Sequence, residues 1–599
     1  MTEINFKGRE FVYNHHLSVP FHPLVPDPNK GIGEPALDGN LVIHGDNLLA
    51  LKSLLPFYAG KVDCVFIDPP YNTGNEGWCY NDNVNAPMIR DWLDANPVGV
   101  DDGLRHDKWC AMIWPRLRLL HQLLSDVGLL FWTVDDNEQQ HARMMLDELF
   151  GSDCFLATVS WVKRYTRSNN ANLFYSMKDH VLVYRASTDL RQVKEPRTVS
   201  ADSGYTNPDD DPRGPWMTSS YVNPATKDRR PNLVYSIDRP GADEAVEHPT
   251  HAWKYSPAEH ARHVAEHRLW WGGDGNADYP RLKLYLSEAQ DMVPVDVWDW
   301  SEVGSSDDGG NEVKRIFGQA VFDNPKPTGL VRKAISLIEN PDAIVLDSFA
   351  GSGTTAHAVL EANKLDGGQR RFILVEMEDY ADRLTAERVR RVCEGYSFAG
   401  KQRTELLRQK ITWSTLRRSD RLLDAIQKID NLQGHQYDSI AKTVKDGELV
   451  VTGESAVTER VEGLGGSFTY CTLGDPVEFD SILTGKALPS WGQLGAVLFN
   501  MATNRTANPA AGREADFYIG QAPDGQHVWL IYKPDLDWLK SPDAALTLSR
   551  AKEIAATASD GHHLVFAPAR YVSQKMLGEQ RIPVEFVPLP FALYRIDRS

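Results

Sequence analysis

Four consecutive residues of this chain, Asp68, Pro69, Pro70 and Tyr71, combine groups that could act on an amine. They follow the apolar stretch 62–67, which has the composition of a strand buried in a parallel sheet. Open α/β sheets bind ligands beyond the carboxyl ends of such strands. An acidic oxygen and a rigid proline carbonyl could hold an amino group beneath the tyrosine ring, as methyl transfer to an exocyclic base nitrogen requires. A Pro-Pro-Tyr loop is also an ordinary turn, so a second motif must decide between these interpretations.

The second motif is residues 344–356, an apolar strand followed by a glycine turn and a helix. Gly351 and Gly353 let the backbone approach a ligand, and the first amides of the helix favour anionic groups. A P-loop needs a lysine before its Ser/Thr, but Gly353 is followed directly by Thr354. A dinucleotide fold needs three glycines, whereas this turn has two, with Phe349 in front. We therefore predict a turn that binds S-adenosylmethionine.

An acid follows this turn at a useful distance. Stretch 371–376 predicts the next strand and ends in Glu376. The acid lies roughly 20 residues beyond the turn, the offset at which a carboxylate can bind ribose hydroxyls. The alternative is a solvated acid at a strand end. The preceding turn favours Glu376 as the ribose ligand.

Together the two motifs resemble a known family. Asp68-Pro69-Pro70-Tyr71 upstream of residues 349–353 is similar to amino-group DNA methyltransferases of the β arrangement, in which the catalytic motif precedes the cofactor motif. Stretches 73–78, 80–83, 211–216 and 322–328 resemble the modification (Mod) subunits of type III restriction-modification systems. The resemblance is strong across about residues 40–395 and weaker beyond them.

The resemblance implies a role for each residue of the tetrad. Asp68 and the carbonyl of Pro69 would accept hydrogen bonds from the target amino group, and Tyr71 would stack on the base. The base must leave the duplex to reach this pocket. Within the family, aspartate at the first position accompanies adenine N6 methylation, so we favour adenine, with cytosine N4 as the alternative. The reaction needs no metal, and we predict none.

The resemblance also extends the set of cofactor residues. Asp46 is similar to the residue that receives the adenine amino group of the cofactor, although it could equally cap the helix that follows. Lys326 belongs to the element that closes over the methionine end, or to a plain turn before a helix. The predicted cofactor contacts are Asp46, Lys326, Asp347, Phe349, Gly351, Gly353, Thr354 and Glu376.

Composition limits where DNA could bind. The formal net charge of −18 argues against a protein that grips DNA over its whole surface, because phosphate binding depends on basic side chains. The candidates lie between the two motifs, where a base-reading segment is expected, although each is more often a solvated or structural side chain. They are Lys163, Arg164, Arg167, Arg213, Trp216, Arg229 and Arg230.

The remaining composition is that of a globular cytoplasmic protein. No stretch approaches membrane-spanning length, and the first residues lack the pattern of a signal peptide. The six cysteines form no C-x-x-C pair, so we expect buried thiols without disulfides or metal ligation. The acids of 135–138 follow a predicted strand and read as the start of a helix.

The elements that position these residues predict an α/β fold: a circularly permuted, Rossmann-like methyltransferase domain with an inserted target-recognition region and a smaller C-terminal α/β domain. Strands are expected at 41–46, 62–67, 128–134, 155–162 and 180–185, and a helix at 108–126. The predicted divisions are an irregular N-terminal arm (1–40), the catalytic half (41–186), the target-recognition region (187–322), the cofactor half (323–395), a helical connector (396–445) and a C-terminal assembly domain (446–599).

Three functions remain open at this point. The first is a sequence-specific adenine methyltransferase that acts within a restriction or related phage-defence assembly. For it the resemblance implies a homodimer on double-stranded DNA and a helicase-nuclease restriction subunit, encoded elsewhere, as its partner. The second is a methyltransferase that acts without a nuclease. The third is a subunit that mainly recognises DNA, against which the intact Asp68, Tyr71, Gly351 and Glu376 argue.

Overall fold

The computed structural model describes residues 3–73, 103–167, 174–240, 245–417, 419–445, 448–476 and 488–589, except 504, 506, 509–510, 523–524, 540 and 559–560. Apart from Thr73, the stretches 73–78 and 80–83 therefore lie outside the described residues, as does Cys79. The chain forms two compact units: the first combines Met1–Gln192 with Val295–Ser599, and the second is Val193–Pro294. No described helix is both long and apolar enough to cross a membrane.

A ten-stranded mixed sheet forms the centre of the first unit, in the order β1-β18-β2-β14-β13-β3-β4-β6-β5-β12. The strands around the predicted site are β2 (Leu41–His44), β14 (Arg371–Glu376), β13 (Ile344–Asp347), β3 (Val62–Ile67) and β4 (Leu124–Val134). These five strands run parallel to one another. Next to them, β6 (Lys178–Arg185) is antiparallel to both β4 and β5 (Phe155–Val162).

The strand order brings the two motifs together. β13 and β14 lie between β2 and β3, although Ile344 of β13 and its contact Asp63 of β3 are 281 positions apart in sequence. Because the five strands are parallel, the catalytic tetrad, the glycine turn, Asp46 and Glu376 follow carboxyl ends at one edge of the sheet. The order of strands thus assembles one site from both halves of the chain.

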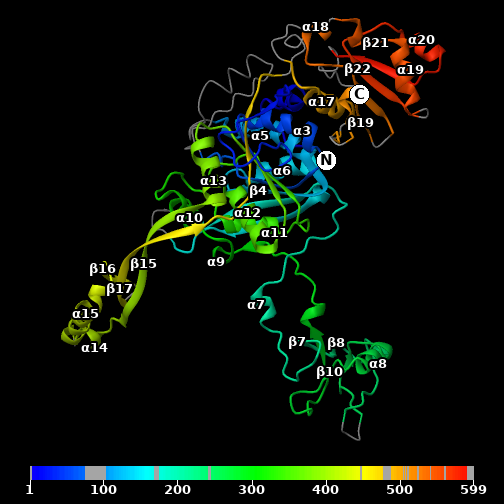
Figure 1. Cartoon of the computed structure of the whole chain (residues 1–599). Helices are drawn as coiled ribbons and strands as arrows, with labels where there is room; N and C mark the ends of the chain where they lie inside the picture. Colours follow the sequence, from blue (N-terminus) through cyan, green and yellow to red (C-terminus); the bar gives the residue numbers. More distant parts are fainter. Residues whose placement is uncertain are drawn as a thin grey trace. The chain divides into compact units, whose positions relative to one another are not determined.

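Helices pack around this sheet in the body that Figure 1 shows at its centre. The main ones are α3 (Asn47–Tyr58), α5 (Arg105–Leu123), α6 (Gln139–Phe150), α11 (Thr328–Ser336), α12 (Thr354–Asp366) and α13 (Glu387–Glu394). The apolar sides of α3, α5 and α6 join the inner strands in one core. The predicted helix at 108–126 is confirmed as α5, but it ends earlier because β4 begins at Leu124 and not at residue 128.

The N-terminal arm is less irregular than predicted. It contains α1 (Arg9–Val12), α2 (His15–Ser18) and β1 (Leu24–Pro26). β1 pairs antiparallel with β18 (Thr469–Leu473), and apolar side chains of the arm enter the core. The five cysteines among the described residues are buried free thiols, as the sequence predicted.

The second unit has its own aromatic core. Its strands are β7 (Trp216–Ser220), β8 (Val222–Thr226), β9 (His251–Trp253), β10 (Leu269–Trp270) and β11 (Arg281–Tyr285), and its longest described helix is α8 (Pro257–Ala265). Tyr221, Ile237, Trp253, Trp271 and Leu282 form the buried cluster. Tryptophans here hold a strand-poor fold together, because large rings bury much apolar area.

The separate unit is shorter than the predicted region 187–322. Residues 295–322 belong to the first unit, where β12 (Val297–Trp298) pairs parallel with β5 and buries Trp298. α9 (Trp300–Val303) and α10 (Ser306–Phe317) follow β12. The composition of 295–322 resembles that of the preceding segment, so sequence alone does not show this division.

The prediction of a helical connector at 396–445 is wrong over its first part. β15 (Gly395–Lys410) pairs antiparallel with β17 (Glu448–Glu462), which also pairs with β16 (Ser439–Lys445). Among the described residues of this segment, α-helix is confined to α14 (Trp413–Leu416) and α15 (Ser419–Gln433). Pairing with a strand far along the chain overrides the helical spacing of leucine and isoleucine in this segment.

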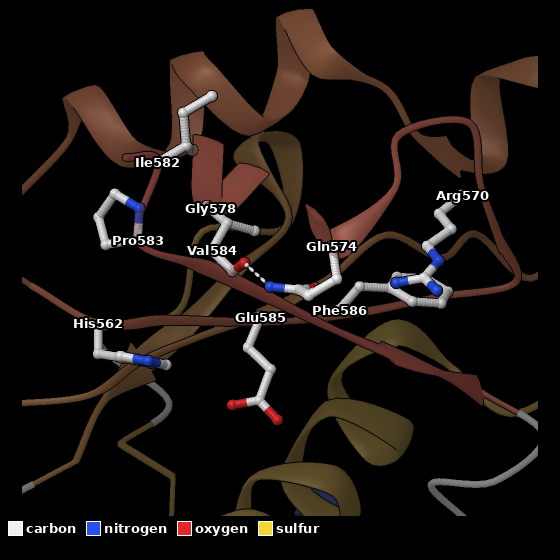
Figure 2. Close-up of a pocket in the computed structure, with 9 residues that line it drawn as sticks. All are labelled: His562, Arg570, Gln574, Gly578, Ile582, Pro583, Val584, Glu585 and Phe586. Atoms are coloured by element: carbon white, nitrogen blue, oxygen red, sulfur yellow. Dashed lines mark hydrogen bonds between the residues drawn. The ribbon is translucent and has the colours of Figure 1, made fainter. Parts of the chain in front are cut away.

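The C-terminal part contains a small sheet with helices. The sheet is β19 (Tyr518–Gln521), β20 (His527–Leu530), β22 (His563–Ala567) and β24 (Val584–Pro588); the longer helices are α17 (Trp491–Thr503), α19 (Leu548–Ala556) and α20 (Gln574–Glu579). A hollow of about 380 Å³ lies beside β24. Within it the Gln574 amide donates to the carbonyl of Val584, while the side chains of Arg570 and Glu585 point to different sides (Figure 2). These side chains do not converge on one ligand position.

Candidate active site

Asp68 is the first residue beyond β3, and its carboxylate is held on both oxygens. The hydroxyl of Thr133, near the carboxyl end of β4, donates to Oδ1 over 2.5 Å. The ammonium of Lys326 donates to Oδ2, also over 2.5 Å, and lies 4.9 Å from the centre of the Tyr71 ring. These two donors fix the orientation of the Asp68 carboxylate at the sheet edge.

Two buried tryptophans stack on each other at the tetrad, and one of them is hydrogen-bonded to Pro70. The indole N–H of Trp109 donates to the carbonyl oxygen of Pro70 over 2.8 Å. Trp109 is fully buried and stacks on Trp132, with ring centres 5.6 Å apart and an interplanar angle of 27°. Burial, followed by the nearby Asp68 charge, raises the pKa of the Tyr71 phenol well above its ordinary value. Tyr71 therefore stays neutral and offers a ring and a hydroxyl to the pocket.

The glycine turn adopts the backbone that its sequence predicts. Gly351 has φ 50° and Gly353 has φ 79°, conformations that other residues rarely take. A Cβ on Gly353 would meet the Thr385 carbonyl at 3.0 Å, and one on Gly351 would meet the Phe322 ring at 3.1 Å. Glycine is required here for conformation and for space.

Asp347 organises the turn. It accepts hydrogen bonds from the Phe349 amide over 3.0 Å and from the Thr355 hydroxyl over 2.6 Å. Burial raises the pKa of Asp347 to about 7. The predicted cofactor residues Asp347 and Phe349 are thus joined directly within one turn.

Glu376 lies against the same turn. Its carboxylate accepts from the Gly351 amide over 2.7 Å and from the Glu378 amide over 3.0 Å. Burial raises the pKa of Glu376 to about 7. The hydroxyl of Ser348 is buried there without a hydrogen-bond partner among the described residues. A turn with two glycines, a buried carboxylate acceptor and a hydroxyl without a partner suit a nucleoside with ribose hydroxyls, so these residues fit S-adenosylmethionine.

Asp46 caps α3, as one of its two interpretations predicted. Its Oδ1 accepts from the amides of Leu48 and Leu49 over 2.8 and 3.3 Å. The next residue, Asn47, donates to the Ser348 carbonyl over 2.9 Å and so connects this turn with the glycine turn. Contact between Asp46 and the adenine of a cofactor stays a prediction.

Lys326 and Thr354 connect the two halves of the site. The Thr354 hydroxyl donates to the Lys326 carbonyl over 3.1 Å, which ties Lys326 to the first turn of α12. The ammonium of Lys326 contacts Asp68 and Tyr71 in this structure. The positive charge of Lys326 therefore lies beside the carboxylate of Asp68 and the ring of Tyr71. The predicted contact of Lys326 with the methionine end of the cofactor stays a prediction.

Arg388, in α13, is a buried residue that sequence analysis missed. Its guanidinium donates to the hydroxyls of Thr354, Ser352 and Thr328 over 2.8, 3.0 and 3.2 Å. Thr328 follows Lys326 by two positions. Arg388 therefore holds the glycine turn and the Lys326 segment in one arrangement.

Two residues predicted to contact DNA, Trp216 and Arg213, make contacts within the second unit. The prediction for Trp216 is wrong in this structure, because its ring is 3% exposed and its indole donates to Asp209. Arg213 binds Asp211 through two nitrogens, each at 2.9 Å, and stacks on Tyr285. Hydrogen bonding to Arg213 holds the pKa of Asp211 far below its ordinary value. Both side chains stabilise the unit itself.

The other side chains predicted to contact DNA differ in whether they are paired within the protein or exposed to solvent. Lys163 pairs with Asp179 over 2.6 Å, and Arg164 binds the Tyr175 hydroxyl. Arg167, Arg229 and Arg230 are exposed. Exposed arginines remain the better candidates for phosphate contacts.

The acids after β4 do start a helix, as predicted, with Glu138 at the N-cap of α6. Among the described residues, His106, Glu138 and His141 have potential metal-ligating atoms within 4.8 Å of one another. Glu138 is fully buried, and it also accepts a hydrogen bond from Asn72, next to Tyr71.

Of the site residues that the sequence analysis did not identify, one could have been found from its position in the sequence. Thr133 lies near the carboxyl end of a predicted strand, and the carboxyl ends of neighbouring parallel strands share one edge of a sheet. Trp109 and Arg388 lie within helices at positions that read as core or solvated face, so their side-chain bonds to the loops were not predictable.

Comparison with known proteins agrees with this geometry. The N6/N4 DNA methylase family matches residues 62–387, more than half of the 599-residue chain. The StyLTI Mod subunit of the type III restriction-modification enzyme from Salmonella typhimurium is 32% identical over 63% of this chain and 58% of its own length. The EcoPI Mod subunit of Escherichia phage P1 is 26% identical over 74% of this chain and 70% of its own length. The type II methyltransferase M.KpnI of Klebsiella pneumoniae is 30% identical over 55% of this chain and 79% of its own length.

The chain thus spans 58% of the length of its Salmonella relative. The matched residues 62–387 contain the catalytic tetrad, Thr133, Lys326 and Glu376. The chain belongs to the N6/N4 family of DNA methylases.

Proposed function

We propose that this protein is a sequence-specific DNA methyltransferase that transfers the methyl group of S-adenosylmethionine to adenine N6 of a base flipped out of the duplex. The observation that carries the proposal is the placement of Asp68. Its carboxylate is oriented by Thr133 and Lys326 at the same sheet edge as the glycine turn and the buried Glu376.

S-adenosylmethionine supplies an electrophilic methyl group when bound. An adenine amino group is a weak nucleophile, because its lone pair is delocalised into the ring. Asp68 and the Pro69 carbonyl accept its two N–H groups, which directs the lone pair out of the ring plane. Tyr71 stacks on the base and excludes water. As the N–C bond forms, the bond between the methyl carbon and sulfur breaks and its electron pair stays on sulfur, which leaves as a neutral thioether. Positive charge develops on the nitrogen, and Asp68 stabilises it until the proton leaves to solvent.

The cofactor would be held by the residues around the glycine turn. Glu376 binds the ribose hydroxyls, Asp46 the adenine amino group, and Gly351 and Gly353 leave room for the nucleoside backbone. Asp347 and Thr354 keep the turn in place through the bonds described above. Phe349 borders the nucleoside.

We further propose that the domain is circularly permuted and that Val193–Pro294 recognises the DNA sequence. The strand order supports the permutation, since the cofactor strands β13 and β14 enter the sheet between β2 and β3. The second unit supports the recognition role because it is compact and follows the catalytic half in sequence. Exposed Arg229 and Arg230 would contact phosphates.

The names of the relatives support a place in restriction-modification. Two of them are Mod subunits of type III enzymes, which suggests a cytoplasmic homodimer on double-stranded DNA with a helicase-nuclease restriction subunit as partner. The C-terminal part would serve assembly. M.KpnI, named a type II methyltransferase, supports the alternative of a methyltransferase that acts without that partner.

Single-molecule sequencing of DNA from a host that expresses the protein tests the proposal. We expect N6-methyladenine at one recurring sequence, lost with Asp68→Ala, while calorimetry still shows S-adenosylmethionine binding. N4-methylcytosine at one sequence would select the cytosine alternative. DNA without new methylation, from a folded protein that binds the cofactor, would refute the proposal.

A further inference from the structure

The residue after the tetrad, Asn72, is hydrogen-bonded to the buried carboxylate of Glu138. Asn72 follows Tyr71, is fully buried and has φ 59°, in the left-handed region that asparagine tolerates better than most residues. Its side-chain amide donates to the Arg105 carbonyl over 3.2 Å and to Oε1 of Glu138. A single side-chain amide thus connects the tetrad to the starts of α5 and α6.

Glu138 is itself surrounded by donors. Nδ1 of His106 lies 2.6 Å from Oε1, and Nδ1 of His141 lies 2.7 Å from Oε2. An ionised carboxylate only accepts hydrogen bonds, so both histidines donate through Nδ1. Hydrogen bonding to Glu138 raises the pKa of His141 above its ordinary value. The carboxylate has donors on both oxygens and can hold one orientation.

These three residues also have the types that bind divalent cations. A cation bound at both Nδ1 atoms would need them unprotonated, and His106 would then carry its proton on Nε2. In the structure the Arg105 Nε–H points to that Nε2 atom over 3.4 Å, which requires Nε2 to accept. The arrangement therefore favours a hydrogen-bonded network with neutral His106 over a cation site.

We propose that Glu138 is a positioning residue for methyl transfer. Through Asn72 it sets the height and tilt of the Pro69 carbonyl and the Tyr71 ring relative to Asp68, which Thr133 and Lys326 hold from the other side. This inference rests on the proposed function. It assigns a role to the Glu138 carboxylate, which sits at a helix start and touches no reacting atom.

The first test is Glu138→Gln, which keeps the size of the side chain but replaces one acceptor with an amide donor. That donor would face either the Asn72 amide or the His141 N–H. We expect kcat to fall on the order of 10- to 100-fold, the range for a displaced reacting group, with little change in the dissociation constant of S-adenosylmethionine. Glu339→Gln, at an exposed glutamate, is the matched control and should keep wild-type kcat.

A charge exchange separates positioning from general structural support. Asn72→Asp places two carboxylates together, so one must hold a proton and activity should rise toward acidic pH. The double variant Asn72→Asp/Glu138→Gln restores one donor and one acceptor with their roles reversed. We expect it to recover much of the lost kcat and to lose the added pH dependence. If the two losses multiply instead, the direct Asn72–Glu138 coupling is wrong.

A measurement that needs no DNA tests the role of Glu138 independently of the proposed function. Hydrogen–deuterium exchange of the amides of residues 71–73 should quicken in Glu138→Gln and stay unchanged in Glu339→Gln. Unchanged exchange together with unchanged kcat would overturn the inference. If the unaltered protein methylates no DNA, the proposed function fails, while the exchange result still decides the role of Glu138. Loss of wild-type activity on chelation and recovery with zinc would replace the network with a cation site.

Discussion

Lys326 Nζ lies 2.5 Å from Oδ2 of Asp68, although the two residues are 258 positions apart in the chain. The lysine segment is also tied to the cofactor side, because the Thr354 hydroxyl donates to the Lys326 carbonyl. One residue therefore contacts the catalytic carboxylate with its side chain and the cofactor helix with its backbone. This relationship suggests that Lys326 acts in catalysis, in addition to or in place of its predicted role in cofactor binding, and a substitution can separate the two roles.

Lys326→Met should impair the chemical step more than cofactor binding. The substitution removes one of the two groups that orient Asp68 and leaves Thr133 in place, so we expect kcat to fall about 100-fold, as for loss of one preorganised donor. The dissociation constant of S-adenosylmethionine should change little. Single-turnover methylation and calorimetry measure the two effects separately.

Lys314→Met, at an exposed lysine of α10, is the control and should behave as the unaltered protein. If Lys326→Met abolishes cofactor binding while bound cofactor still reacts at the normal rate, the original prediction of a cofactor contact holds and the catalytic role fails.

Glu376 should make cofactor binding depend on pH near neutrality. Burial raises its pKa to about 7, and the ionised form is the better acceptor for ribose hydroxyls. Affinity for S-adenosylmethionine should therefore weaken as pH falls from 8 to 6. Glu376→Gln should bind weakly and with a flatter pH dependence between the same values. Calorimetry at several pH values measures this, and parallel pH curves for the two proteins would contradict the assignment.

The same carboxyl group should affect stability in the opposite direction. Its folded pKa lies above its ordinary value of 4.5, so the folded state binds the proton more tightly than the unfolded chain does. This contribution is complete below about pH 4.5 and is lost as pH rises through about 7, by about 3 kcal/mol in total. In the absence of cofactor, urea unfolding at pH 5 and 7.5 should show a smaller decline for Glu376→Gln than for the unaltered protein. An equal decline would refute the raised pKa.

Sequence predicted the residues at strand ends far better than those in helices. Asp68, Gly351 and Glu376 could be placed because apolar strands lead directly into them, and parallel strands share an edge. Sequence places Lys326 in the site but does not predict its contact with Asp68, since side-chain reach across 258 positions has no sequence signal. Arg388 lies on a helix rich in arginine, where a solvated residue and a buried one look alike. β15 was taken for helix because its partner β17 begins about 40 residues later.

Arg388→Met should destabilise the cofactor half of the site. The guanidinium is fully buried, and its loss leaves hydroxyls of Ser352, Thr354 and Thr328 without their donor. We expect the free energy of unfolding to fall by about 3 kcal/mol. S-adenosylmethionine should restore part of that loss by binding only the folded state.

Arg383→Met, at an exposed arginine five positions before Arg388, should change stability by no more than about 0.5 kcal/mol. Urea titration with tryptophan fluorescence measures both variants. Equal, small effects would show that Arg388 does not support the turn.

Arg229→Ala/Arg230→Ala should weaken DNA binding without changing the chemistry. Both arginines are exposed in the second unit, where Arg213 and Trp216 are already used by internal contacts. Each arginine that neutralises a phosphate contributes about 0.9 to the slope of log affinity against log salt concentration. The double variant should therefore bind DNA more weakly at low salt, with a slope shallower by about 1 to 2. Its S-adenosylmethionine affinity and its preference among DNA sequences should be unchanged, because phosphate contacts position a protein but do not read bases.

Fluorescence anisotropy over a salt series measures the slope. Lys364→Ala, at an exposed lysine in the last turn of α12 in the first unit, should leave the slope as it is. A slope unchanged by the arginine substitutions would place the DNA elsewhere on the protein.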